Sequence, residues 1–491
     1  MIARVPSVDL IIRPRQRGGI ARTLAAPLAH HTYGMSTPKS QSIAGRYPGL
    51  ANLLIDFNQM QAFMEDPLVI VDADGVRLTD SEGRSYIDAI AGVAAVQLGH
   101  GNRPIIEAMQ AQLERVALAL PLYAANEPEI ELAERVIELL PSKFTSVKFT
   151  SGGSEANEAA MKMARQYHHQ TGNPGKYKII SRYASYHGAT LGALSATGGA
   201  ARKSKFEPFP TGFVKIHPPD CYHCPFNLKY PDCGVLCAEI VDDVIRNEDP
   251  ETVAALIAEP VMMTADAFVA PPSEYFAILR DICDRHNVLL IFDEIITGFG
   301  RLGEMFGADL YHAYPDMMTV GKGISGGYAP LAATITSGPV ADSFLGGRDA
   351  GVHFNAGHTY SGNPVACAAG LAAVRQIAHG GVIENCRRQS EHLRRRLAEM
   401  ADRYPVIGRI DGHGLLIGVE FVADRDRHTQ FPADRLFGRA VGAEARSRGL
   451  IGRAGDHVWV FAPPLTSSDD EIDEMSDIFD ASIAEVLETE T

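Results

Sequence analysis

The feature that most constrains the fold is a run of five apolar residues at positions 288–292, which ends at Asp293. The run, Val-Leu-Leu-Ile-Phe, is rich in β-branched and aromatic residues. A continuous run of this length is typical of a strand buried on both faces, as in a parallel sheet covered by helices. Open sheets of this kind place their chemistry at the carboxyl ends of the strands. The sequence therefore predicts that Asp293 lies at a functional edge of a sheet.

A second apolar run ends at Val320 and is followed by a lysine between two glycines, Gly321-Lys322-Gly323. Glycines let the backbone turn sharply, so the lysine amine projects clear of bulky neighbours. A carboxylate and an amine at two strand ends suit pyridoxal phosphate, because a lysine holds that cofactor as a Schiff base and an acid keeps its ring nitrogen protonated. Each motif alone is more often a strand end or a solvated turn, and the functional interpretation rests on their combination.

Strands and helices alternate around these motifs from about residue 145 to residue 335. The pattern predicts strands at 146–150, 178–181, 254–258, 288–292 and 331–337, and helices at 151–169 and 273–286. Such alternation indicates an α/β fold with a mostly parallel central sheet and helices on both faces.

The two ends of the folded chain have a different pattern. Residues 69–88 alternate apolar and polar side chains around two turns, which predicts a small antiparallel meander. The C-terminal part combines expected strands at 414–421 and 458–462 with expected helices at 391–401 and 469–487. We therefore expect a large cofactor-binding domain at 89–370 and a smaller α+β domain at 371–491, which an N-terminal segment at 35–88 joins.

Residues 1–34 contain five arginines and a single acidic residue, Asp9. An arginine-rich, acid-poor leader is similar to an organellar transit peptide, although serine is scarce here. We favour a disordered or mis-assigned leader, with Met35 as the working start.

The charge balance excludes some classes of function. The chain has 491 residues with 45 basic and 60 acidic side chains, so its net charge of −15 gives no support to nucleic-acid or anionic-membrane binding. No apolar run approaches the ~20 residues that span a bilayer. We expect a cytoplasmic protein without nucleic-acid or membrane partners.

Three further motifs offer groups for a flat, anionic cofactor. The glycines and Ser154 of Ser151-Gly-Gly-Ser-Glu-Ala-Asn precede a helix, where backbone amides and the helix dipole bind phosphate; the structural alternative is a plain N-cap. Tyr186, in Tyr186-His-Gly, could stack on a ring, although buried tyrosines more often only pack. Glu259-Pro260 ends the strand at 254–258.

Four cysteines lie close together in a segment at about 217–240, which we interpret as an insertion. Their spacing is C-x2-C-x8-C-x3-C, and the residues are Cys221, Cys224, Cys233 and Cys237. A structural zinc site is one interpretation, but the second pair lacks the usual C-x2-C spacing, so we favour four reduced cysteines without a metal. Seven cysteines and no secretory signal indicate a reducing compartment.

Taken together, these motifs resemble the class III (ω) aminotransferases, which are fold-type I pyridoxal-phosphate enzymes. The resemblance extends over about residues 50–490 in the family's order and includes two later motifs, His358-Thr-Tyr-Ser-Gly-Asn-Pro and Ala462-Pro-Pro-Leu. It implies a transaminase (EC 2.6.1.-) that moves an amino group to a 2-oxo acid by a ping-pong Schiff-base mechanism with pyridoxal 5′-phosphate. Alternatives are a decarboxylase, lyase or aminomutase on the same fold, or an inactive relative that acts as a binding protein.

The resemblance also implies roles for single residues. Lys322 would form the Schiff base, Asp293 would pair with the ring nitrogen and Glu259 would steady the site. The cofactor would contact Gly153, Ser154, Tyr186, His187, Asp293, Ile295, Lys322 and Thr359. Because Thr359 matches a threonine that reaches the phosphate of the neighbouring subunit, the resemblance implies a homodimer with shared sites, and a tetramer is the alternative assembly.

The expected substrates are less closely defined. Ile296 occupies a position where 4-aminobutyrate and ornithine enzymes commonly have glutamine, which favours amine or ω-amino acid:pyruvate transaminases over a 4-aminobutyrate or diamine:2-oxoglutarate enzyme. Arg453 matches a mobile arginine that binds the acceptor carboxylate, although a solvated arginine is the alternative. The expected substrate contacts are Val93, Ala94, Tyr186 and Arg453. The small residues at 93–95, where many relatives have a bulky aromatic residue, predict a wide substrate pocket.

Overall fold

The computed structural model describes residues 43–263 and 268–489. The chain divides into two units, Met1–Pro67 and Leu68–Thr491, and each is described by itself. The described part of the first unit contains α1 (Ile43–Arg46), η1 (Pro48–Asn52) and α2 (Met60–Glu65). The leader predicted at 1–34 lies outside the described residues.

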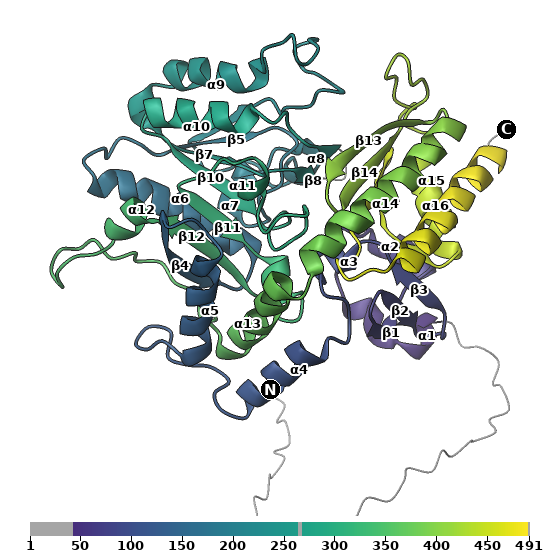
Figure 1. Ribbon diagram of the computed structural model, residues 1–491, viewed down its shortest axis with the longest axis horizontal. Helices are drawn as coiled ribbons and strands as arrows, with labels where there is room; N and C mark the ends of the chain where they lie inside the picture. The colour runs from purple at the N-terminus through teal and green to yellow at the C-terminus, as the bar shows by residue number, and fades with distance from the viewer. Residues whose placement is uncertain (1–42, 264–267, 490–491) are drawn as a thin grey trace, which may run out of the picture. The chain divides into compact units, whose positions relative to one another are not determined.

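The second unit contains a seven-stranded sheet with the order β4-β12-β11-β10-β7-β5-β6 (Figure 1). The bounds are β4 Phe144–Thr150, β5 Lys178–Arg182, β6 Phe213–Ile216, β7 Val253–Ala258, β10 Leu289–Glu294, β11 Met317–Val320 and β12 Ala332–Ser337. Strand β12 is antiparallel to both β11 and β4, and the other pairs are parallel. Six strands therefore run in one direction, which confirms the predicted α/β fold with a mostly parallel sheet.

Alternate residues of the central strands pack against helices on opposite faces of this sheet. On one face, Ile257 and Ile291 join a cluster with α6 (Gly153–Gln170) and α12 (Gly338–Asp342). On the other, Leu256 and Phe292 join the core that includes α9 (Leu236–Asn247), α10 (Tyr275–Arg285), α5 (Glu127–Glu138) and α13 (Pro364–His379). Both faces are thus covered, and the strand ends remain for the site.

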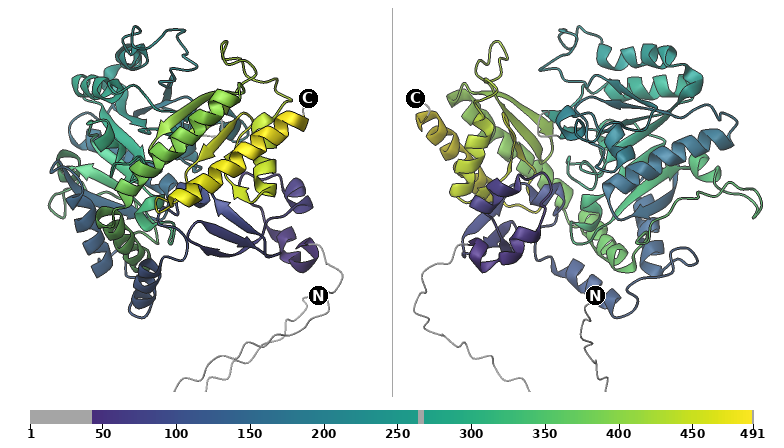
Figure 2. Two further views of the ribbon diagram at one scale, coloured as in Figure 1. Left: turned by 45° about the vertical axis from the view of Figure 1, so that its right-hand side comes forward. Right: turned by 180° about the vertical axis from the view of Figure 1, so that it is seen from behind.

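The C-terminal part forms a four-stranded sheet with the order β13-β14-β17-β16. Its strands are β13 Ile407–His413, β14 Leu416–Phe421, β16 Arg453–Ala454 and β17 Val458–Phe461. Helices α14 (Val382–Arg403), α15 (Phe437–Ser447) and α16 (Asp469–Thr489) lie on it, seen in green and yellow in Figure 2. The fully buried Trp459 packs against Phe461 and Phe479, so β17 and α16 share one core.

The predicted meander consists of β1 (Ile70–Asp74), β2 (Arg77–Asp80) and β3 (Ser85–Asp88). Strand β15 (Leu450–Ile451) pairs in parallel with β3, so this sheet combines residues from both ends of the second unit. A small hairpin of β8 (Met262–Met263) and β9 (Phe268–Val269) follows β7. The domain boundaries at residues 35, 89 and 371 stay a prediction.

The remaining helices lie in the connections between strands. They are α3 (Ala91–Ala94), α4 (Arg103–Leu113), α7 (Leu191–Ala196), α8 (Ala200–Lys203), η2 (Pro250–Thr252), α11 (Gly307–Leu310) and η3 (Lys322–Ser325). Within the described ranges, no single helix is long and apolar enough to cross a membrane; α13 and α14, bent by 65°, meet that test only as a pair, by length and composition.

Candidate active site

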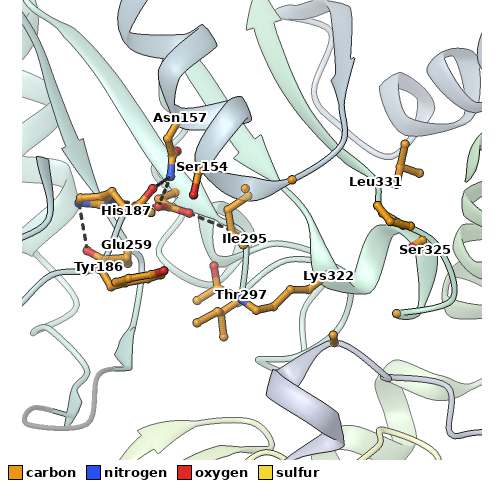
Figure 3. Close-up of a pocket in the computed structure, with 18 of the residues that line it drawn as sticks. Ser154, Asn157, Tyr186, His187, Glu259, Ile295, Thr297, Lys322, Ser325 and Leu331 are labelled. Atoms are coloured by element: carbon orange, nitrogen blue, oxygen red, sulfur yellow. Dashed lines mark hydrogen bonds and ion pairs between the residues drawn. The ribbon is translucent and has the colours of Figure 1, made fainter. Parts of the chain in front are cut away.

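One cavity collects the residues that follow the strands of the large sheet. Its volume of about 440 Å³ is in the range usual for small-molecule sites. Asp293 reaches it from the end of β10 and Lys322 from the turn after β11. Tyr186 and Glu259 reach it from the segments after β5 and β7 (Figure 3). Because parallel strands end at the same edge of a sheet, residues distant in sequence meet here.

The Asp293 carboxylate is almost fully buried and held in one orientation. Its Oδ2 accepts a hydrogen bond from Asn157 Nδ2 at 2.8 Å and lies 2.8 Å from His187 Nδ1. Its Oδ1 accepts the backbone N–H of Ile295 at 3.1 Å. The carboxylate thus has a neighbour within hydrogen-bond distance at each of its two oxygens.

Asn157 is a site residue to which the sequence analysis assigned no role. Its Nδ2 also donates to the backbone oxygen of His187 at 2.6 Å, and its Oδ1 accepts the Thr319 hydroxyl at 2.6 Å. The amide thereby ties α6 to the ends of β10 and β11. A signal existed in the sequence: Asn157 is a lone amide beside the small residues Ala156, Ala159 and Ala160 on the buried face of α6.

A row of buried polar side chains continues from Asp293. The ring of His187 lies between two carboxylates, because its Nε2 is 3.7 Å from Glu259 Oε2. Glu259 Oε1 accepts the backbone N–H of Tyr186 at 2.8 Å, and Glu259 Oε2 accepts a hydrogen bond from Arg182 at 2.9 Å. The order of side chains is therefore Asp293, His187, Glu259, Arg182.

Lys322 is the first residue of η3 and has a φ of +46°, which is unusual for a residue with a side chain. Adding a Cβ to Gly323 would bring it within 2.5 Å of the Gln97 side chain, so this glycine lets the turn close. Burial lowers the pKa of Lys322 to about 8, although the Asp293 charge opposes the shift, and the Arg453 charge lowers it further. The amine therefore loses its proton at a lower pH than an ordinary lysine does.

The amino end of α6 also lines the cavity. Ser154 lies in the first turn of α6, and its hydroxyl accepts the backbone N–H of Ala189 at 3.0 Å. A Cβ at Gly153 would lie 3.1 Å from the Ile295 side chain, so a larger residue there would require Ile295 to shift. A helix amino end with a hydroxyl and two glycines suits an anion, and phosphate binding at Gly153 and Ser154 stays a prediction.

The remaining walls are aromatic and apolar. Tyr186, Ile295 and Ile296 line the cavity together with Val261 and Met263. The Arg202 guanidinium lies 4.9 Å from the centre of the Tyr186 ring. In Figure 3, Lys322 points from η3 toward the side of the cavity that holds Tyr186 and His187.

Four predicted residues do not line this cavity in the part of the chain that the structure describes. Thr359 is exposed, and Val93 is 59% exposed. Ala94 is buried, and its neighbour Ala95 lines the cavity instead. Arg453 lies on β16, close enough for its charge to act on Lys322.

The neighbouring acid, Glu294, holds the start of a helix. Its carboxylate accepts the backbone N–H groups of Gly307 and Ala308, both at 2.8 Å, which begin α11. Burial raises its pKa to about 7. The two adjacent acids thus have different roles: Asp293 lines the cavity, and Glu294 binds the first backbone N–H groups of α11.

The four clustered cysteines line one small pocket and carry no disulfide. Cys237 belongs to the first turn of α9, and burial raises its pKa to about 12. Among the described residues, no group of three or more histidine, cysteine or acidic side chains is arranged to hold a metal ion. The metal-free interpretation of these cysteines stays a prediction.

Comparison with known proteins gives a consistent result. Residues 60–483 match the family described as "Aminotransferase class-III". A protein named "Probable aminotransferase Rv3329", from Mycobacterium tuberculosis, is 39% identical over 453 residues, which cover 90% of this chain and 96% of that protein. "Gamma aminobutyrate transaminase 1, mitochondrial", from Solanum lycopersicum, is 34% identical over 432 residues, or 86% of this chain and 82% of that one.

Among solved structures, a thermostable (S)-enantioselective omega-transaminase from Thermomicrobium roseum superposes with a TM-score of 0.86. The two sequences are 36% identical, and the match covers 92% of this chain and all of the other.

Proposed function

The chain belongs to the class III aminotransferases, and from this premise we propose that it moves an amino group from an amine or ω-amino acid to pyruvate. Enzymes of this class are pyridoxal-phosphate-dependent transferases of nitrogenous groups, EC 2.6.1.-. The observation that carries the proposal is the shared cavity of Lys322, Asp293 and the amino end of α6.

The cavity offers one group for each reactive end of this cofactor. A buried carboxylate suits the ring nitrogen, a buried amine with a lowered pKa suits the aldehyde, and a helix amino end suits the phosphate. Tyr186 and Ile295 supply the flat and apolar surfaces for the two faces of the ring. The residues present therefore fit pyridoxal phosphate.

When bound, pyridoxal phosphate supplies an aldehyde that takes the amino group and a ring that withdraws electrons from the bond being broken. Asp293 would hold the proton at the ring nitrogen. The neutral Lys322 amine would hold the cofactor and, once displaced by substrate, would move a proton to and from the substrate carbon. Asn157 would keep Asp293 in place, and the buried walls would exclude water.

Two features support pyruvate and apolar amines as substrates. Ile296 places an apolar side chain in the cavity where a glutamine would be expected in 4-aminobutyrate enzymes. The charge of Arg453 acts at Lys322, so an acceptor carboxylate could be bound by this arginine. The similarity to a 4-aminobutyrate transaminase favours a second candidate, a 4-aminobutyrate or diamine:2-oxoglutarate enzyme.

A substrate panel separates these candidates. Purified enzyme would be given small amines, bulky aryl amines and ω-amino acids, each with pyruvate or 2-oxoglutarate, and product formation would be measured. We expect turnover with pyruvate and with bulky amines, since Ala95 leaves the cavity wall open. Ala95→Trp should then reduce turnover of bulky amines about tenfold more than that of small amines, the discrimination typical of steric exclusion. Equal losses, or a preference for 2-oxoglutarate, would count against the proposal.

We further propose a homodimer in which Thr359 completes the phosphate site of the partner. The supporting observation is the segment between α4 and α5, where large apolar side chains are exposed: Leu118, Leu120, Leu122 and Tyr123, the last by 86%. Apolar side chains gathered in one exposed segment are typical of an interaction surface.

A further inference from the structure

Arg182 has no part in the function proposed above, yet it is the most costly kind of residue to bury. It ends β5, its side chain is fully buried, and its guanidinium lies 6.0 Å from the centre of the Tyr275 ring. A charged group without water requires a paired partner. Arg182 finds that partner in Glu259, a residue of the site, to whose carboxylate and backbone oxygen it donates hydrogen bonds.

This pairing determines the charge of Glu259. Burial opposes ionisation, but the charges of His187 and Arg182 and the Tyr186 N–H lower the pKa of Glu259 below its ordinary value. Glu259 is therefore an anion that faces the inner nitrogen of the His187 ring.

His187 lies between two carboxylates, one on each side of its ring. Nδ1 is 2.8 Å from Asp293 Oδ2, and Nε2 is 3.7 Å from Glu259 Oε2. Nε2 is buried and has no hydrogen-bond partner among the described residues. A neutral ring would turn an unprotonated nitrogen toward one of the two anions, whereas a doubly protonated ring places an N–H toward each.

We propose that Arg182, Glu259 and His187 form a chain of alternating charges that keeps Asp293 anionic, with Arg182 as a positioning residue for the reaction. The order of charges is positive at Arg182, negative at Glu259, positive at His187 and negative at Asp293. Each group stabilises the next, and the last negative charge faces the cavity. The inference rests on the proposed seating of the cofactor's ring nitrogen against Asp293.

The chain of charges affects the cofactor only through Asp293, so the test compares cofactors that do and do not interact with Asp293. Apoenzyme would be titrated with pyridoxal phosphate and with an analogue in which CH replaces the ring nitrogen, and both affinities would be measured by absorbance or fluorescence. Arg182→Gln should weaken binding of pyridoxal phosphate by about tenfold, the effect of weakening one hydrogen bond between charged groups, and binding of the analogue by less than about twofold. Arg182→Lys retains the charge and should restore most of the difference.

A second variant and a spectroscopic measurement distinguish loss of the charge chain from misfolding of Arg182→Gln. Glu259→Gln keeps the shape of the side chain and should reproduce the selective loss. Nitrogen NMR of the holoenzyme, labelled at histidine and in the cofactor ring, should show both His187 nitrogens protonated in the wild type and one of them unprotonated in Glu259→Gln.

The outcomes separate this inference from the proposed function. If the wild type binds both cofactor forms equally, the seating against Asp293 fails. If the wild type discriminates but both variants lose the same affinity for the two forms, or if His187 is neutral in the wild type, the charge chain is overturned and Arg182 is only structural.

Discussion

At the scale of single residues, burial decides which chemistry a side chain offers. Asp293 and Glu294 are adjacent, yet one faces the cavity and the other begins α11. Lys322 is buried near one acid, and its amine is driven toward the neutral, nucleophilic form.

Capture of the cofactor by the apoenzyme should therefore increase through about pH 8. The sign follows from the lowered pKa of Lys322, because the neutral amine is the reactive form and becomes the major form above that value. Stopped-flow absorbance measures the rate of cofactor capture across pH 6–11, roughly the interval from the unperturbed His pKa to the unperturbed Lys pKa. The midpoint of this pH dependence reports the pKa of Lys322. Arg453→Leu removes a charge that lowers this pKa and should shift the midpoint upward. A midpoint near the ordinary lysine value of 10.5 would contradict the assignment.

At the scale of elements, the connection that follows β5 contains a glycine that is packed too closely to accept a side chain without a shift of its neighbours. Gly188 has a φ of +137°, and a Cβ there would lie 2.5 Å from Ser154 Oγ. The turn after Tyr186 and His187 therefore packs directly onto the amino end of α6.

Gly188→Ala should lower the stability of the apoenzyme by roughly 2–3 kcal/mol, because overpacking adds to backbone strain. Gly172→Ala is the matched control: its φ is +90°, but nothing lies within 4 Å of the added Cβ. The control should cost only about 1 kcal/mol. Denaturant unfolding of both variants gives the comparison, and equal losses would mean that contact with Ser154 is unimportant.

At the scale of the whole molecule, the proposal places Thr359 in the site of a partner subunit and so requires a dimer. Thr359 is exposed and does not line the cavity formed by the described residues of its own chain. An exposed apolar segment between α4 and α5 gives that dimer a surface on which to form.

A mixture of two inactive variants should recover activity. In a dimer of Lys322→Ala with Thr359→Asp, one site carries both changes and the other carries neither. Random reassociation makes half of the dimers mixed, so about a quarter of the sites become intact. Turnover after dissociation and reassociation is compared with each variant alone.

The control pairs Lys322→Ala with Asp293→Ala; if these two residues act within one chain, no site becomes intact. Recovery absent from the first mixture, or equal in both, would contradict sharing through Thr359.

Much of the architecture follows from local pattern. The strands that end at Asp293 and Val320, the helix after Ser151 and the meander at 69–88 were all predicted within a few residues, because burial on one or both faces imposes a period that the sequence records. Strand β6, strand β13 and helices α9 and α15 were not predicted. In β13 partly buried residues weaken the alternation, and α9 begins inside the cysteine-rich segment.

By itself, the sequence determined the fold class, the family resemblance and the two strand ends that carry Asp293 and Lys322. It stated the metal-free cysteines, the cytoplasmic location and the acceptor only as predictions, and all three remain so. Tertiary structure alone decided that Asn157 holds Asp293, that Ala95 rather than Ala94 lines the cavity, and that Arg182 pairs with Glu259. The physical reason is that periodicity records whether a residue is buried, whereas its charged or hydrogen-bonded partner comes from another element, at a distance in sequence that no local pattern encodes.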